Sequence, residues 1–131
     1  LRSVDNPVCS HCDTGEIDHA WYHSLSSCAH TSHVIGWMVQ KLNTLPIQPV
    51  DINTALWLQF PPPITENDLL CAVWIVGEAV TYSWAKRKNR EDLSVTSLQA
   101  ILLTKAQTLS KTEKYADAGH QLCVVLGTNA L

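Results

Sequence analysis

The chain has 131 residues, of which 46% are apolar and 16% are charged, and its formal net charge at pH 7 is −3. This length fits one domain, and the apolar content is sufficient for a hydrophobic core without disulfides. The slight acidity argues against a protein that holds nucleic acid through its overall field, so any such contact must be local. The longest apolar run, Leu69 to Val76, is too short to cross a bilayer, and the opening residues show no signal-peptide pattern. We therefore expect one intracellular domain, nuclear or cytoplasmic, with no membrane partner.

Residues 8–33 are rich in Cys, His, Ser and Thr and poor in aliphatic side chains. Because such a segment cannot build a hydrophobic core, something other than burial must order it. Cys9-x2-Cys12, followed after ten residues by His23-x4-Cys28, supplies three thiolates and one imidazole. Two close pairs of this kind can surround one tetrahedral Zn²⁺, and four protein ligands leave no position for a catalytic water. The spacing predicts a structural zinc knuckle.

Two alternatives for this segment stay open. His19 competes with His23 for the imidazole position, although it leaves a looser second pair. The other interpretation is a loop with buried free thiols, since free cysteine often behaves as a small apolar residue. Burial as a free thiol explains Cys71 and Cys123 well, because both lie inside apolar helical runs. It explains Cys9 and Cys12 badly. The five cysteines, an odd number, favour metal-binding thiolates in a reducing compartment over a disulfide framework.

The first predicted helix runs from about residue 32 to 43, where apolar residues recur every three or four positions. Two prolines in 45–50 withhold backbone donors and predict a connector. In 55–60 the apolar residues are nearly continuous, so periodicity does not separate a short strand from a half-buried extended segment.

A long central helix is predicted next. Thr65 suits the N-cap, and Glu66 and Asp68 fall in the first turn, where the unpaired amides and the helix dipole favour negative charge. Apolar residues over 69–84 cover more than one stripe, so we expect burial on most sides in the first half of the helix. The polar run over 86–92 ends it.

Two further helices complete the chain. Ser94 suits the N-cap of a helix whose apolar residues recur from 98 to 109. After a weak joint at 110–112 the same spacing continues from 115 to 125, and Gly127 fits a helix stop.

The predicted fold is mainly α: a Cys-Cys-His-Cys zinc knuckle in residues 8–33 and a small helical bundle in 34–131, within one domain of residues 1–131. The sequence has no glycine-rich phosphate loop, no H-E-x-x-H pair and no G-x-S-x-G elbow. Asp117, in a short Tyr-Ala-Asp-Ala run, lacks the second carboxylate that two catalytic metal ions require. We expect no enzymatic activity and no small-molecule substrate.

A cluster of cations follows the central helix. Its simplest interpretation is a solvated helix end. If the chain binds nucleic acid, these cations are the expected phosphate contacts, and Trp21 and Tyr22, beside the zinc ligands, are the expected stacking partners. Tryptophans at helical apolar positions are expected in the core instead. The cluster consists of Lys86, Arg87, Lys88 and Arg90.

The Cys-Cys-His-Cys set and the segments after it resemble the C-terminal zinc-binding region of LINE-type (non-LTR) retrotransposon reverse transcriptases. The similarity covers about residues 7–125 and includes Trp37-Met38-Val39-Gln40-Lys41-Leu42, Leu56-Trp57-Leu58-Gln59-Phe60-Pro61 and Ser83-Trp84-Ala85-Lys86-Arg87. Its one sharp motif is the set of four ligands.

In that family the region follows the polymerase domain and helps to engage template RNA or target DNA during target-primed reverse transcription. The resemblance implies a non-catalytic accessory domain whose zinc is held by Cys9, Cys12, His23 and Cys28. The resemblance also implies that the partners are RNA or DNA and the polymerase portion of the same polyprotein. The alternative is a zinc-stabilised helical module that docks on proteins and does not bind nucleic acid.

Overall fold

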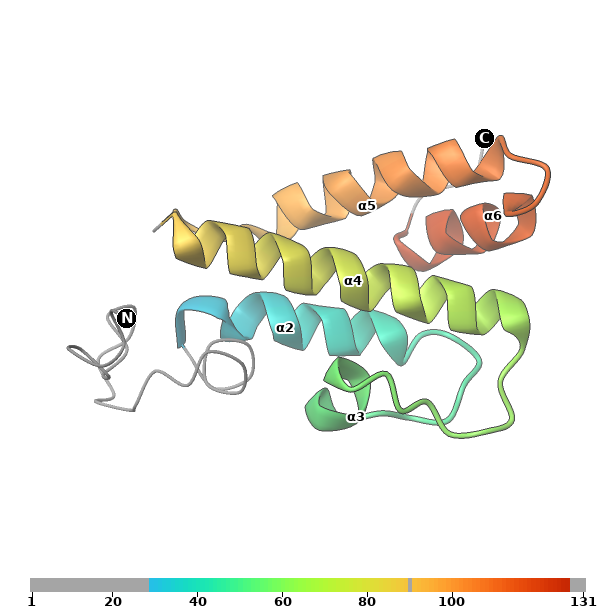
Figure 1. The fold of residues 1–131 in the computed structure, drawn as a ribbon, viewed down its shortest axis with the longest axis horizontal. Helices are drawn as coiled ribbons and strands as arrows, with labels where there is room; N and C mark the ends of the chain where they lie inside the picture. The colour runs from blue at the N-terminus through green and yellow to red at the C-terminus, as the bar shows by residue number, and fades with distance from the viewer. Residues whose placement is uncertain (1–28, 90, 128–131) are drawn as a thin grey trace.

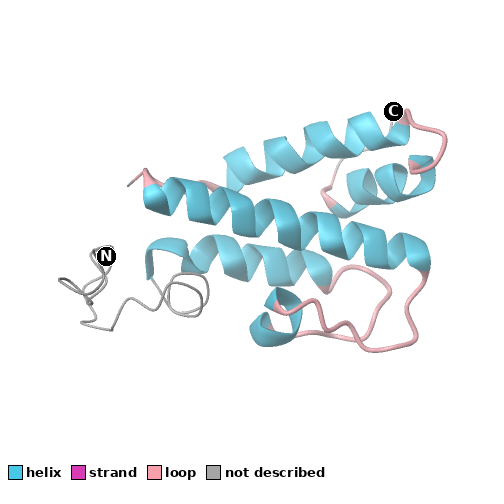
Figure 2. Cartoon of the chain, viewed as in Figure 1, coloured by secondary structure: helices cyan, strands magenta, loops and turns pink. Residues whose placement is uncertain are grey.

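The structure, a computed structural model, describes residues 29–89 and 91–127 and folds them into helices connected by loops and turns (Figure 1). No strand occurs in these two ranges (Figure 2), so the mainly α prediction is confirmed for this part of the chain. The predicted knuckle ligands lie outside the described residues. The helices are α2 (Ala29–Leu42), α3 (Ile52–Leu56), α4 (Glu66–Lys88), α5 (Val95–Ser110) and α6 (Ala116–Val125).

Helix α4 is the centre of the arrangement. It packs against α2 on one side and against α5 and α6 on the other, while the short α3 packs against α2 (Figure 1). The core between these helices is built from side chains that are fully shielded from water. The largest of them are Ile35, Met38, Leu42, Ile75, Leu98, Leu102, Leu122 and Leu126.

The predicted start of α4 is confirmed. The Thr65 side chain accepts a hydrogen bond from the Asp68 amide at 3.1 Å, which satisfies one of the unpaired donors of the first turn. Asp68 is itself buried, and its carboxylate accepts a hydrogen bond from the side-chain amide of Gln121 in α6. This contact ties the first turn of α4 to the last helix.

The burial predicted for α4 is wrong at three positions. Trp84, expected in the core, is 42% exposed, and Leu69 and Val73, in the first half where burial on most sides was predicted, are exposed to a similar degree. All three lie on one side of α4. A helix with apolar residues on several faces exposes whichever face its neighbours leave open.

Residues 52–56 form a helix, where the sequence left a strand or an extended segment open for 55–60. The reason is local: the Asp51 carboxylate accepts a hydrogen bond from the Thr54 amide at 2.8 Å and caps α3. The helix buries Ala55 and ends at once, because Leu58 has a φ of 56°. At the other end of the body, α2 begins at Ala29, about three residues earlier than predicted.

Helices α5 and α6 form a tight pair. Ser94 caps α5 as predicted, with its hydroxyl accepting from the Ser97 amide at 3.2 Å. The two helices approach closely at Gly119 of α6, where a Cβ atom would lie only 2.8 Å from the Ala106 carbonyl oxygen. Gly127, with a φ of 84°, follows α6 and fits the predicted stop.

Candidate nucleic-acid interface

The last turns of α4 bring Trp84, Arg87 and Lys88 together. Residues three and four positions apart are neighbours on a helix surface, so the two cationic side chains lie beside the indole. These three residues line a hollow of about 350 Å³ on the protein surface. A second hollow, of about 360 Å³, lies along the same helix and is lined by Val80, Thr81, Trp84, Ala85 and Lys88.

The side chain of Trp84 is partly exposed in the part of the chain that the structure describes. The rings of two other tryptophans lie beneath lysine ammonium groups: Lys41 is 5.9 Å from the centroid of the Trp37 ring, and Lys105 is 5.2 Å from that of Trp74. No described cation lies over the Trp84 ring in this way. The indole is therefore available to a ligand.

Lys86 belongs to a different surface of α4. Its ammonium nitrogen lies 3.5 Å from a carboxylate oxygen of Glu91 and 5.7 Å from the centroid of the Tyr82 ring. Tyr82 also accepts a hydrogen bond from the Ser94 amide at 3.0 Å, which holds the start of α5 against α4. Of the four predicted phosphate contacts, the structure groups Arg87 and Lys88 with an aromatic ring, separates Lys86 from them, and does not describe Arg90.

The cations also offset the field of their own helix. The C-terminal end of a helix carries a partial negative charge, which alone would repel a phosphate. Three cationic residues occupy the last turn of α4, and Lys88 is exposed. Glu91, the nearest following acid, lies 3.5 Å from the Lys86 ammonium nitrogen. The last turn of α4 thus carries positive charge beside the indole.

This basic end lies where the Cys/His segment joins the helical body. Helices α2 and α4 run in opposite directions, so the end of α4 and the start of α2 share one end of the bundle (Figure 1). His33, near the start of α2, has its Nε2 atom 3.3 Å from the Leu93 carbonyl oxygen, just after α4. Cys28, the last predicted zinc ligand, immediately precedes α2 in the sequence.

The described side chains of the helical body form no metal site. Among residues 31–89 and 91–127, no three Cys, His, Asp or Glu side chains are grouped so that they could hold a metal ion. Cys9, Cys12, His23 and Cys28, with the competing His19, lie outside the described residues. Trp21 and Tyr22, the predicted stacking partners, lie outside them as well.

The other two cysteines are structural. Cys71 and Cys123 are buried and unpaired, which confirms their interpretation as small apolar residues. The Cys71 thiol donates a hydrogen bond to the Ala118 carbonyl at 3.4 Å. Burial, with a smaller contribution from the charge of Asp68, raises the pKa of this thiol to about 12, so it is neither a nucleophile nor a metal ligand at neutral pH.

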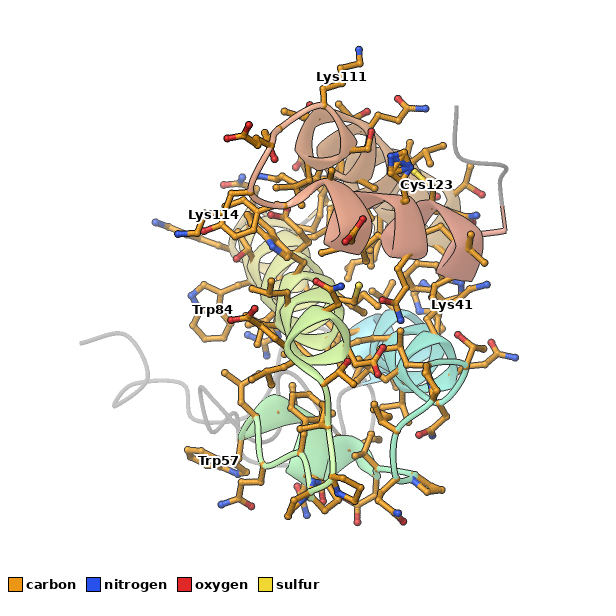
Figure 3. The ribbon with its side chains drawn as sticks, turned by 90° about the vertical axis from the view of Figure 1, so that its right-hand side faces the viewer. Lys41, Trp57, Trp84, Lys111, Lys114 and Cys123 are labelled. Carbon is orange, nitrogen blue, oxygen red and sulfur yellow. The ribbon has the colours of Figure 1, made fainter. Side chains whose placement is uncertain are left out.

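Sequence reasoning missed two exposed tryptophans among the residues that the structure describes. Trp57 is 60% exposed and Trp84 is 42% exposed, and Figure 3 shows both pointing away from the body on the same side. The signal for Trp84 was present in the sequence: Thr81 and Lys88, at three positions before it and four after it, place polar side chains on the same helical face.

None of the described helices combines the length and the apolar character that a membrane span requires. Comparison with known proteins finds no matching family model, no matching curated protein and no matching solved structure. The chemistry of the site is therefore what indicates its function.

Proposed function

We propose that this chain is a non-catalytic zinc-binding accessory domain of a retrotransposon reverse transcriptase, which binds template RNA or target DNA during target-primed reverse transcription. The observation that carries the proposal is the grouping of Trp84 with Arg87 and Lys88 at one end of α4. An exposed aromatic ring beside cations is the combination that nucleic acid requires, since it offers both phosphate neutralisation and base stacking.

The zinc contributes order to the same end of the protein in this proposal. Cys9, Cys12, His23 and Cys28 would close two short turns around one ion, and the chain passes from Cys28 directly into α2. A knuckle held in this way stays close to the basic end of α4. The two parts would then contact one nucleic acid, with the polymerase portion of the same polyprotein as the further partner.

The test is the salt dependence of binding. Labelled RNA and DNA oligonucleotides are titrated with the full chain between about 50 and 200 mM salt, with fluorescence anisotropy as the readout. Each phosphate contact contributes about 0.7 to 0.9 to the slope of log K against log salt. Arg87→Ala combined with Lys88→Ala should therefore weaken binding and lower this slope by about 1.4 to 1.8.

A matched control is available at the other end of the bundle. Lys111 follows α5 and Lys114 lies before α6, and both are exposed. Replacing these two lysines with alanine removes the same charge and should leave the salt slope within error of the unmodified protein. Equal losses in both double variants would show only a general effect of net charge. A folded protein with no affinity for any oligonucleotide would instead favour the docking module.

The zinc is tested separately. Elemental analysis of the purified chain should find one equivalent of zinc, and Cys12→Ser should lose it. His19→Ala and His23→Ala decide between the two candidate imidazoles, because only the true ligand lowers metal retention in a competition with a chelator. A protein that stays folded and metal-free would contradict the knuckle.

A further inference from the structure

Two surface hollows on α4 adjoin the indole of Trp84. Trp84 and Lys88 line both of them, whereas Arg87 lines only the first and Val80 and Ala85 line only the second. The indole therefore borders two recesses of about 350 Å³ and 360 Å³.

The lining of these recesses fits an unpaired base and its phosphate. The second hollow has an apolar wall from Val80 and Ala85, against which the flat face of a base can lie. Lys88 borders both recesses, and Arg87 borders the first. A strand that stacks a base on the exposed part of the Trp84 indole would carry its neighbouring phosphates past these cations.

A double helix does not fit this arrangement equally well. Its bases already stack on one another, and separating one step to admit an indole costs a few kcal/mol. Unpaired bases are free to stack on an aromatic ring, and every base has a π face, so recognition by stacking tolerates any sequence. The site thus discriminates between strands by their pairing and not by their sequence.

We infer that Trp84, with Arg87 and Lys88, forms a binding site for single-stranded nucleic acid in which unpaired bases stack on the indole. This inference rests on the proposed function and names the form of nucleic acid that the site takes. Single-stranded RNA and single-stranded DNA offer the same base faces and phosphates, so both are ligands of the site.

A protein is the alternative ligand for the surface around Trp84. The apolar surface continues from Val80 to Gly77, Val73 and Leu58, which line a hollow of about 240 Å³. An apolar peptide could bind this surface, but it would have no use for the cations at the C-terminal end of α4, beside Trp84. The charge of Arg87 and Lys88 complements phosphates and favours the strand.

The experiment compares oligonucleotides of one mixed sequence as single-stranded RNA, single-stranded DNA and duplex DNA, bound to the full zinc-loaded chain. We expect the single strands to bind at least about tenfold more tightly than the duplex. Trp84→Ala should lower single-strand affinity by about 5-fold to 150-fold, which is the effect of losing one stacked base, and Trp84→Phe should restore part of it. Duplex affinity should change by less than about twofold in Trp84→Ala.

Trp57→Ala is the matched control, because Trp57 is the other exposed tryptophan among the described residues and is the C-cap of α3. It should leave single-strand affinity unchanged. Circular dichroism verifies that each variant is folded. Quenching of tryptophan emission by single-stranded DNA provides a second readout, since it should fall in Trp84→Phe and persist in Trp57→Phe.

The outcomes distinguish the failure of the stacking site from the failure of the proposed function. Equal affinity for single strands and duplex, unchanged by Trp84→Ala, overturns the stacking site and leaves nucleic-acid binding intact. No affinity for any oligonucleotide overturns the proposed function itself. Single-strand affinity that falls in Trp84→Ala supports the site, whether RNA and DNA bind equally or a 2′-hydroxyl contact adds to the affinity for RNA.

Discussion

Gly119→Ala should destabilise this protein, although alanine is the better helix former. In an open helix this substitution gains about 1 kcal/mol of stability. At Gly119 the added Cβ would lie 2.8 Å from the Ala106 carbonyl oxygen and 2.8 Å from the Leu109 carbonyl carbon, and closer still to the Ser110 amide nitrogen. All three are backbone atoms of α5, whose last residue is Ser110, so no side-chain rotation relieves the contact.

The magnitude follows from these opposing terms. Overpacking costs about 1–3 kcal/mol, and a contact with several backbone atoms of a neighbouring helix belongs at the upper end of that range. After the gain in helix propensity is subtracted, Gly119→Ala should lose about 2 kcal/mol of unfolding free energy and lower Tm by about 5 °C or more. Urea denaturation followed by circular dichroism measures the loss.

Gly77 is the matched control within α4. A Cβ there would meet no atom within 4 Å, and the residue is exposed. Gly77→Ala should therefore stabilise the protein by about 0.5–1 kcal/mol. Opposite signs for the two glycines are the expected result. If Gly119→Ala were as stable as Gly77→Ala, the close approach of α6 to α5 would be refuted.

Three further predictions concern caps and thiols. Ser94→Ala should cost about 1 kcal/mol in urea denaturation, because it removes the N-cap of α5, and Ser94→Asp should restore most of it. The hydrogen bond from the Thr54 amide lowers the pKa of Asp51 from 3.8, so its stabilising effect is present above that pH and is lost as the pH falls through the folded-state value. Asp51→Asn keeps a cap and should remove this part of the acid dependence, and an unchanged acid profile would contradict the contact. Cys71 and Cys123 should resist an aromatic disulfide reagent at pH 8 in the folded protein and react fully in urea, because burial raises both pKa values. Rapid reaction of either thiol in the native state would show that the core is not closed around it.

Much of the helical layout is a property of the local sequence. Thr65 and Ser94 each provide a side-chain acceptor for an amide three residues later, and both caps act as predicted. The spacing of apolar residues predicted α2, α4, α5 and α6. The short α3 was not predicted, because a nearly continuous apolar run carries no periodicity and the cap at Asp51 went unrecognised.

The candidate site was predicted only in part. Arg87 and Lys88 are adjacent in the sequence, so their charge was evident, but nothing in the spacing separated them from Lys86, which faces Glu91. Trp84 was assigned to the core because it lies at an apolar helical position. Its role depends on what covers it, and that depends on segments far away in the chain.

Local sequence determined where helices begin, where they end and which residues could bind phosphate, because caps, dipoles and periodicity act within a few residues. Tertiary structure decided which faces are covered. Helix α4 is apolar on several sides, and only the positions of α2, α5 and α6 leave Trp84 in contact with water. The same packing requires a glycine at residue 119, where two backbones meet. Burial is a relation between distant segments, so periodicity within one helix does not specify it.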